Sequence, residues 1–284
     1  MMPEHATDCH MHVLGPFDRY PLAAERAYNV PEAPLEAHER MKRRVGLERT
    51  VLVQASGHGN DNRAMLETLA QLGPRGRAVA VLPPEVSSKE LESMHAAGVR
   101  GLRLNLVTLP SRYGSDHARL VGDYQRLLAP LGWHLQVFAN AATLQALEPV
   151  LQRCRVNVVI DHMGLPDAAA GTAQPGFQAL LRLMRQEHVW VKLAGADRIT
   201  RASGRLRDAL PFMQALAQVA PQRLVWGSDW PHIGFHSGRQ VRGDALLPYR
   251  EVDTGALLEV LFEAIPDAQA RRAVLAGNPA RLYL

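Results

Sequence analysis

The amino-acid sequence predicts an α/β protein with the architecture of a (β/α)8 (TIM) barrel, in which a single domain spans residues 1–284. The length of 284 residues suits one such barrel, which takes about 250 residues. Short apolar runs alternate with segments of helical period, as expected for repeated βα units and a parallel sheet. The sequence contains eight such runs, the number of strands that closes this barrel.

Each expected strand is an apolar run of strand length, and a helical stretch follows it. The strands are expected at 6–13, 50–55, 77–82, 99–106, 133–138, 156–161, 188–193 and 223–227. The intervening helices are expected at 36–45, 62–71, 87–97, 124–131, 144–152, 177–187 and 206–220, and a helical tail begins at Gly255.

Three connections are longer than the others, at 14–34, 163–175 and 228–254. They follow the first, sixth and eighth strands, so in a barrel all three lie at the end that carries active sites. An open doubly wound sheet is the alternative, and it usually has a glycine-rich phosphate-binding turn after its first strand. The sequence has no such turn there, which favours the barrel.

Composition narrows the class of protein. Hydrophobic residues make up 47% and charged residues 21% of the chain, enough apolar content to fill a core without disulfides or a structural metal. Two cysteines, Cys9 and Cys154, are too few for a disulfide framework. No run approaches the roughly 18 apolar residues of a membrane span, and the N-terminus lacks the layout of a secretory signal. We therefore expect a cytoplasmic protein without a membrane partner.

The formal net charge is only +4, from 32 basic and 28 acidic residues. The one dense basic run, residues 40–44, falls inside an expected helix, where a solvated helix face is the ordinary interpretation. No aromatic pattern typical of RNA-binding proteins accompanies it. We expect no nucleic-acid partner.

Ionisable residues gather where expected strands end. His10 and His12 are two apart on the first strand, so both side chains point to one side, toward the barrel mouth. The sixth strand stops at Asp161 and His162, and the eighth is followed by Asp229. A carboxylate buried at a strand end is costly unless it is paired or hydrogen bonded. These residues predict a site that binds a metal ion or a polar substrate.

Four motifs carry a resemblance to a known family. They are the His-x-His of the first strand, Asp-His-Met-Gly at 161–164, Gly-Ser-Asp-Trp-Pro-His at 227–232 and Asn-Pro-Ala-Arg-Leu-Tyr at 278–283. Together they resemble the amidohydrolase superfamily, in its amidohydrolase-related branch, over essentially the whole chain. The segments at 53–63 and 98–105 resemble the 2-pyrone-4,6-dicarboxylate lactonase family most strongly. Sugar-acid lactonases and sulfomuconolactone hydrolases are relatives on the same scaffold.

The resemblance implies a hydrolase that opens a small carboxylated lactone, its small-molecule partner. Asp229 matches the general base that takes a proton from the attacking water. His10, His12 and His162 match residues that polarise the scissile carbonyl or bind a metal. The residues matched to substrate binding are Ser56, Arg103 and Arg198, which hold carboxylates, and Tyr28, which makes a further polar contact.

Two departures from the family pattern limit these expectations. Phe138 stands on the fifth strand where the lactonase family has a tyrosine and metal-dependent members have a ligand. We therefore expect no two-metal site and no required cofactor; the alternative is one divalent ion, zinc or manganese, held by His10, His12 and Asp229. Leu109 stands in place of a second carboxylate-binding arginine, and Arg112 is the candidate substitute.

Other interpretations remain open from sequence alone. Arg103 can serve as a structural ion pair within the barrel, and Arg198 can pair locally with Asp197. The histidines on expected mouth loops, which are His58, His232 and His236, can line the pocket, and the ordinary interpretation is that they are surface residues. A metal-dependent amide hydrolase or decarboxylase of the same superfamily is one alternative function, and a non-catalytic barrel that binds an acidic metabolite is another. Either a monomer or a homodimer is expected.

Overall fold

The computed structural model describes residues 2–108, 113–200, 204–235 and 245–284. Three residues singled out in the sequence, Leu109, Arg112 and His236, lie outside these ranges.

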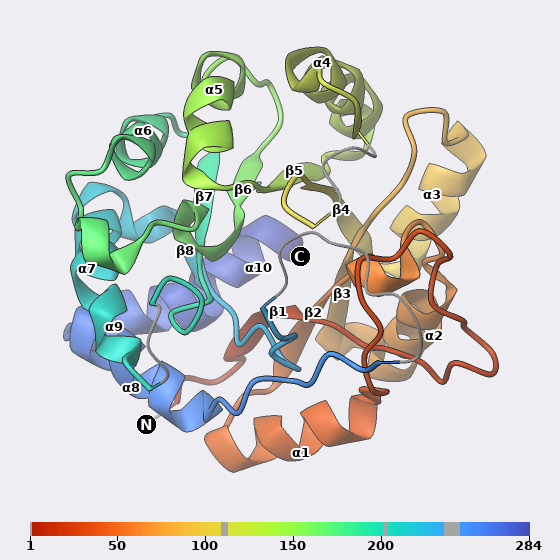
Figure 1. Ribbon diagram of the computed structural model, residues 1–284, viewed down its shortest axis with the longest axis horizontal. Helices are drawn as coiled ribbons and strands as arrows, with labels where there is room; N and C mark the ends of the chain where they lie inside the picture. Colours follow the sequence, from red (N-terminus) through yellow and green to blue (C-terminus); the bar gives the residue numbers. More distant parts are fainter. Residues whose placement is uncertain (1, 109–112, 201–203, 236–244) are drawn as a thin grey trace.

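All eight expected strands are present, and they pair in parallel in the order of the sequence. They are β1 (Thr7–Met11), β2 (Arg49–Val53), β3 (Gly76–Ala80), β4 (Val99–Asn105), β5 (His134–Phe138), β6 (Val158–Ile160), β7 (Val189–Leu193) and β8 (Leu224–Trp226). A parallel bridge between Met11 and Trp230 joins the segment that follows β8 to the end of β1. The predicted barrel is thus confirmed, and the strands surround a common axis in Figure 1.

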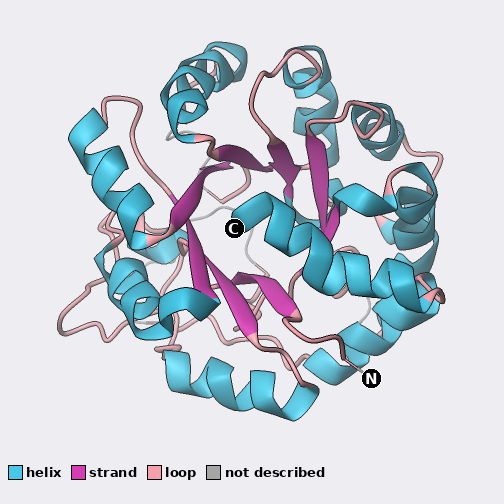
Figure 2. Cartoon of the chain, turned by 180° about the vertical axis from the view of Figure 1, so that it is seen from behind, coloured by secondary structure: helices cyan, strands magenta, loops and turns pink. Residues whose placement is uncertain are grey.

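Most of the helices surround this ring of strands, as Figure 2 shows from the opposite side. They are α1 (Leu35–Val45), α2 (Arg63–Leu72), α3 (Ser88–Ala97), α4 (His117–Leu128), α5 (Ala141–Leu151), α6 (Pro175–Leu183), α7 (Leu210–Val219), α8 (Thr254–Ala264), α9 (Ala268–Arg272) and α10 (Asn278–Tyr283).

Several helix boundaries differ from the prediction by a few residues, and the largest difference is at the start of α4. Helix α4 begins at His117 rather than at residue 124, because Asp116 caps it: the Asp116 carboxylate accepts a hydrogen bond from the Arg119 backbone N–H at 2.9 Å. The helical tail from Gly255 is present as α8 to α10.

Two layers of side chains fill the inside of the barrel. The lower layer is apolar and includes two residues of α10, whose end lies over the middle of the barrel in Figure 2. Its members are Cys9, Val51, Val53, Val79, Val159, Trp190, Val225, Leu282 and Tyr283. Nearer the carboxyl ends of the strands lies a buried polar layer formed by His10, Arg103, Gln136, Asp161 and Lys192. This layer forms the floor beneath the candidate site.

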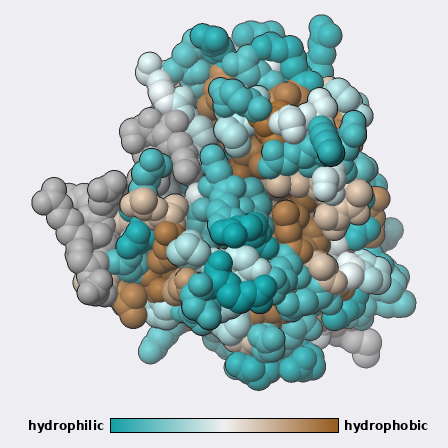
Figure 3. All heavy atoms as spheres, turned by 90° about the vertical axis from the view of Figure 1, so that its right-hand side faces the viewer, coloured by the Kyte–Doolittle hydropathy of each residue, from teal (hydrophilic) through white to brown (hydrophobic). Residues whose placement is uncertain are grey.

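Hydrophilic residues cover most of the face shown in Figure 3, with smaller hydrophobic areas between them. Within the described ranges, the helices are all too short or too polar to cross a membrane.

Candidate active site

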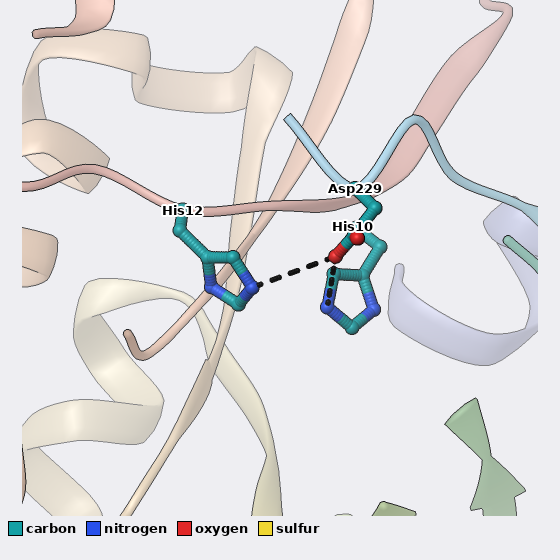
Figure 4. Close-up of side chains that lie close together, drawn as sticks. All are labelled: His10, His12 and Asp229. Atoms are coloured by element: carbon teal, nitrogen blue, oxygen red, sulfur yellow. Dashed lines mark ion pairs between the residues drawn. The ribbon is translucent and has the colours of Figure 1, made fainter. Parts of the chain in front are cut away.

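The end of β1 lies against the chain that follows β8. The Asp229 backbone N–H donates to the His10 carbonyl oxygen at 2.8 Å, and the His12 N–H donates to the Trp230 carbonyl oxygen at 2.9 Å. These bonds place the Asp229 side chain beside both histidines, as Figure 4 shows. The predicted convergence of His10, His12 and Asp229 is therefore present.

Asp8, which the sequence analysis did not single out, holds this junction together. Its carboxylate accepts hydrogen bonds from the Ser228 backbone N–H at 2.8 Å, the Ser228 hydroxyl at 2.6 Å and the His10 N–H at 3.1 Å. The His38 ring of α1 lies 2.9 Å from the same carboxylate. Because Ser228 directly precedes Asp229, these bonds fix where β8 ends relative to β1.

One oxygen of Asp229 faces three imidazoles. Asp229 Oδ1 lies 3.7 Å from His10 Nε2, 3.9 Å from His12 Nε2 and 3.7 Å from His162 Nε2. All four side chains are buried. Each separation is longer than a hydrogen bond, so the four groups surround a point rather than bond to one another.

His162 and Asp229 both have left-handed backbone conformations, with φ of 50° and 63°. Non-glycine residues adopt this conformation uncommonly, and it carries a cost that the surrounding structure must offset. At both positions the left-handed conformation occurs within three residues of the end of a strand, and the side chain faces the barrel interior.

Burial determines the charge of the three histidines. It lowers the pKa of His12 and of His162 to about 4, and it lowers the pKa of His10 well below its ordinary value. Burial alone would raise the pKa of Asp229, but nearby positive charge, chiefly from Arg198, outweighs it and holds that pKa well below its ordinary range. At neutral pH the site therefore combines neutral imidazoles with an ionised carboxylate.

Hydrogen-bond partners decide which ring nitrogen carries the proton. His12 Nδ1 lies 2.8 Å from the Val53 carbonyl oxygen, which can only accept, so Nδ1 is protonated and Nε2 presents a lone pair to Asp229. His10 Nδ1 lies 3.3 Å from the Asp161 carboxylate, which favours the same tautomer. His162 Nδ1 has no hydrogen-bond partner within the described part of the chain, so its Nε2 can carry the proton.

The donor set fits one divalent metal ion. Ligand atoms of His10, His12 and Asp229 all lie within 4.8 Å of one another, and so do those of His10, Asp161 and His162. His10 Nε2 and Asp229 Oδ1 are buried without a hydrogen-bond partner among the described residues. Two imidazole lone pairs and a carboxylate oxygen that converge in this way are ligands that zinc accepts.

Arg198 pairs with Asp229 rather than with its chain neighbour. Its Nε donates to Asp229 Oδ2, whereas Asp197 pairs with Arg250 from the connection after β8. The local Arg198–Asp197 pair considered from sequence is thus replaced by two longer-range pairs. Arg250, which the sequence analysis missed, also lies 3.6 Å from Asp229 Oδ2. Oδ2 is therefore engaged by arginine, which leaves Oδ1 facing the histidines.

Arg103 fits both interpretations drawn from the sequence. Its Nε donates to Asp161 Oδ2 at 2.9 Å, which is the structural ion pair. The same side chain lines the central cavity and lies over the Phe138 ring, 4.8 Å from its centroid.

Asp161 has four partners on four different strands. Besides Arg103, Gln136 Nε2 donates to Oδ2 at 3.0 Å, while His10 Nδ1 and Lys192 Nζ lie 3.3 Å and 3.8 Å from Oδ1. Burial lowers the pKa of Lys192 to about 8. The sequence signal for Gln136 and Lys192 was a polar residue inside an otherwise apolar strand, which predicts a buried partner.

The central cavity has a volume of about 150 Å³ and opens at the carboxyl ends of the strands. Its polar lining includes seven predicted site residues, which are His12, Tyr28, Ser56, Arg103, His162, Arg198 and Asp229. Tyr28 and Ser56 are hydrogen bonded to each other through their hydroxyls at 2.6 Å. Phe138, Leu165, Ile233 and Phe235 form an apolar wall. A cavity of this volume holds about one six-membered ring.

Two loop histidines are not the surface residues that were expected. His58 is 2% exposed and His232 is 4% exposed. His58 Nε2 accepts a hydrogen bond from the Gly15 N–H at 3.2 Å, so the ring holds the connection after β1 in place. Neither residue lines the central cavity.

Comparison with known proteins gives consistent matches over the whole chain. A family model described as amidohydrolase matches residues 7–284. The chain is 32% identical to a 4-sulfomuconolactone hydrolase of Hydrogenophaga intermedia, over 100% of this chain and 90% of that protein. It is also 32% identical to a 2-pyrone-4,6-dicarboxylate hydrolase of Comamonas testosteroni, over 99% and 91% of the two chains.

A similar solved structure comes from Pseudomonas putida and is described as a candidate 2-pyrone-4,6-dicarboxylic acid hydrolase. It superposes with a TM-score of 0.78 at 32% identity and covers 99% of this chain and 98% of its own.

Proposed function

The chain belongs to the amidohydrolase family, and from that premise we propose that it hydrolyses a small carboxylated lactone. The observation that carries the proposal is the cavity, in which an ionised carboxylate, neutral histidines and two arginines surround space for one ring. The curated relatives with about a third of their residues identical are hydrolases of 4-sulfomuconolactone and 2-pyrone-4,6-dicarboxylate, both of them lactones bearing acidic groups.

Asp229 supplies the base. Ester hydrolysis needs a water made nucleophilic by proton removal, and Oδ1 of Asp229 is the carboxylate oxygen not bonded to Arg198. The low pKa keeps this carboxylate ionised at neutral pH.

His162 supplies the hydrogen-bond donor for the oxyanion. Its Nε2 lies on the same side of the cavity as Asp229 Oδ1, and its tautomer is not dictated by a partner at Nδ1 among the described residues. A neutral imidazole that donates from Nε2 stabilises the negative charge that develops on the carbonyl oxygen. His10 and His12 present lone pairs instead, so they suit a cation and not an oxyanion.

A divalent ion, zinc or manganese, would be held by His10, His12 and Asp229 and would supply Lewis-acid polarisation of the carbonyl. The lone pairs on His10 and His12 favour such an ion. This proposal differs from the sequence-based prediction that no cofactor is required. Phe138 lies at the end of β5 and offers no ligand, which argues against a second ion.

Arg103 and Arg198 bind the acidic group of the substrate. Each uses Nε for an internal carboxylate and lines the cavity, so we infer that its remaining guanidinium nitrogens face an acidic ligand. The planar guanidinium matches a carboxylate in a way that a lysine ammonium does not. Ser56 and Tyr28 add hydroxyls to the lining of the same cavity.

The direct test is Asp229→Asn assayed against 2-pyrone-4,6-dicarboxylate. We expect kcat to fall about 10³-fold, within the range for loss of a general base, while the circular dichroism spectrum is unchanged. Turnover within about threefold of the unaltered protein would show that Asp229 is not the general base.

Release of carbon dioxide from an aromatic acid would indicate the decarboxylase alternative instead. A ligand that raises the melting temperature without being consumed would indicate a non-catalytic binding protein.

Metal content is the second test, measured by plasma mass spectrometry on untagged protein. We expect about one zinc or manganese ion per chain, and its loss in a His12→Ala variant, because that variant removes one of the two lone pairs. Less than about a tenth of an equivalent in an active preparation would restore the prediction that no cofactor is required.

A further inference from the structure

The buried carboxylate of Asp161 connects the two halves of the site without reaching the substrate. It is fully buried and does not line the central cavity. Its Oδ2 accepts from Arg103 and Gln136, on β4 and β5, and its Oδ1 faces His10 and Lys192, on β1 and β7. One carboxylate therefore contacts both the arginine that faces the substrate and a histidine of the reaction centre.

The two oxygens impose different constraints. The bond from Arg103 Nε to Oδ2 holds one edge of the guanidinium against Asp161, so that the opposite edge of this cavity-lining side chain can bind an acidic ligand. On the other side, the contact with His10 Nδ1 favours the tautomer in which Nε2 points its lone pair at the reaction centre.

Lys192 balances the charge of this arrangement. It is completely buried, donates to the Cys9 carbonyl oxygen at 2.8 Å and makes its charge contact with Asp161. A buried carboxylate needs such compensation, and so does each buried cation. Among the described residues, Lys192 makes no hydrogen bond or ion pair with Arg103 or His10. Removing Lys192 together with the Asp161 charge therefore keeps the buried charge balanced without taking a partner from either residue.

We infer that Asp161 is a positioning residue that sets the orientation of Arg103 toward the substrate's acidic group and the tautomer of His10 at the same time. The activity part of this inference rests on the proposed lactone hydrolysis. The binding part does not rest on that proposal, because it concerns only how Arg103 binds the carboxylate of a ligand.

The binding experiment uses isophthalate, a non-hydrolysable ring with two carboxylates, and isothermal titration calorimetry. In the charge-balanced variant Asp161→Asn/Lys192→Met we expect the Kd to rise about tenfold, while the melting temperature stays near that of the unaltered protein. Lys192→Met alone is the matched control: it keeps every contact of Asp161 with Arg103 and His10, so the Kd should change less than about threefold.

A double-mutant cycle shows whether Asp161 acts through Arg103. Arg103→Met should weaken isophthalate binding by itself, and adding the charge-balanced pair to it should cause little further loss. Additive losses, or a charge-balanced variant that is folded and binds isophthalate normally, would overturn the inference. Failure of the unaltered protein to bind isophthalate would also overturn it, because Arg103 would then not bind carboxylates.

The effect of Asp161 on His10 is tested separately, by steady-state kinetics. With a neutral lactone, which does not need Arg103, the charge-balanced variant should lose about 10- to 100-fold in kcat with little change in KM, the range for loss of an orienting partner. An unchanged kcat would contradict the proposal that Asp161 sets the tautomer of His10.

If the unaltered protein binds isophthalate but hydrolyses no lactone, the proposed function fails while the positioning of Arg103 is still tested. Loss of bound metal equal to that in His12→Ala would make Asp161 a ligand and overturn its positioning role.

Discussion

Arg103 illustrates how one side chain serves the structure and, in the proposed function, also binds the substrate. Its Nε edge pairs with Asp161, and its plane lies over Phe138, whose ring also meets the His162 ring edge-on with centroids 5.0 Å apart. The phenylalanine thus packs between the arginine and the histidine, where it offers a face to the cation and no group to ligate or donate.

Arg103→Met should raise the KM for acidic lactones about 10- to 100-fold, because a charge-assisted hydrogen bond is lost. The KM for neutral lactones should change little, and kcat should be largely retained for both. Steady-state kinetics on a matched pair of acidic and neutral substrates measures this. An equal loss on both would assign Arg103 to the ion pair with Asp161 alone.

At the scale of elements, the packing beneath the polar layer depends on close contact between neighbouring strands. Gly101 of β4 pairs with His134 of β5, and a Cβ atom at Gly101 would lie 2.3 Å from the His134 ring. The glycine therefore leaves room for a buried imidazole inside the barrel, directly below Arg103 and Gln136.

Gly101→Ala should lower the free energy of unfolding by about 1–3 kcal/mol, the usual cost of overpacking a core. Urea unfolding measures it. The matched control is Gly122→Ala on α4, where the nearest atom would be 3.9 Å away and the alanine should stabilise the helix by up to about 1 kcal/mol. Equal effects of the two substitutions would show that the strands can separate enough to admit the methyl group.

At the scale of the whole molecule, the C-terminal helix closes the barrel at the end opposite the site. Tyr283 is 2% exposed, and its ring meets His134 edge-on with centroids 5.3 Å apart. Its hydroxyl is buried and has no hydrogen-bond partner in the described part of the chain. The ring therefore contributes packing, whereas the hydroxyl contributes a desolvation cost.

Tyr283→Phe should leave the free energy of unfolding unchanged or raise it by up to about 1 kcal/mol, because an unpaired buried hydroxyl is removed. Tyr283→Ala should lower it by about 3–5 kcal/mol, the usual loss for a large aromatic in a core. Thermal and urea unfolding compare the two. A phenylalanine variant as unstable as the alanine variant would show that the hydroxyl is satisfied.

The sequence by itself determined the eight strands, the barrel and the convergence of His10, His12, His162 and Asp229. Apolar runs of strand length are local signals, and carboxyl ends of parallel strands always meet at one end of a barrel. The start of α4 was missed because a cap depends on one hydrogen bond, from the Arg119 N–H to Asp116, and not on the hydrophobic period. The oligomeric state, monomer or homodimer, remains a prediction.

Only the tertiary structure decided how the charges pair. The sequence places Arg198 next to Asp197, yet Arg198 pairs with Asp229, and Asp197 pairs with Arg250 from a distant connection. Likewise, Asp161 meets partners from four strands that are far apart along the chain. Ion pairs and histidine tautomers follow from distances of a few ångströms between separate strands, and spacing along one strand carries no information about them.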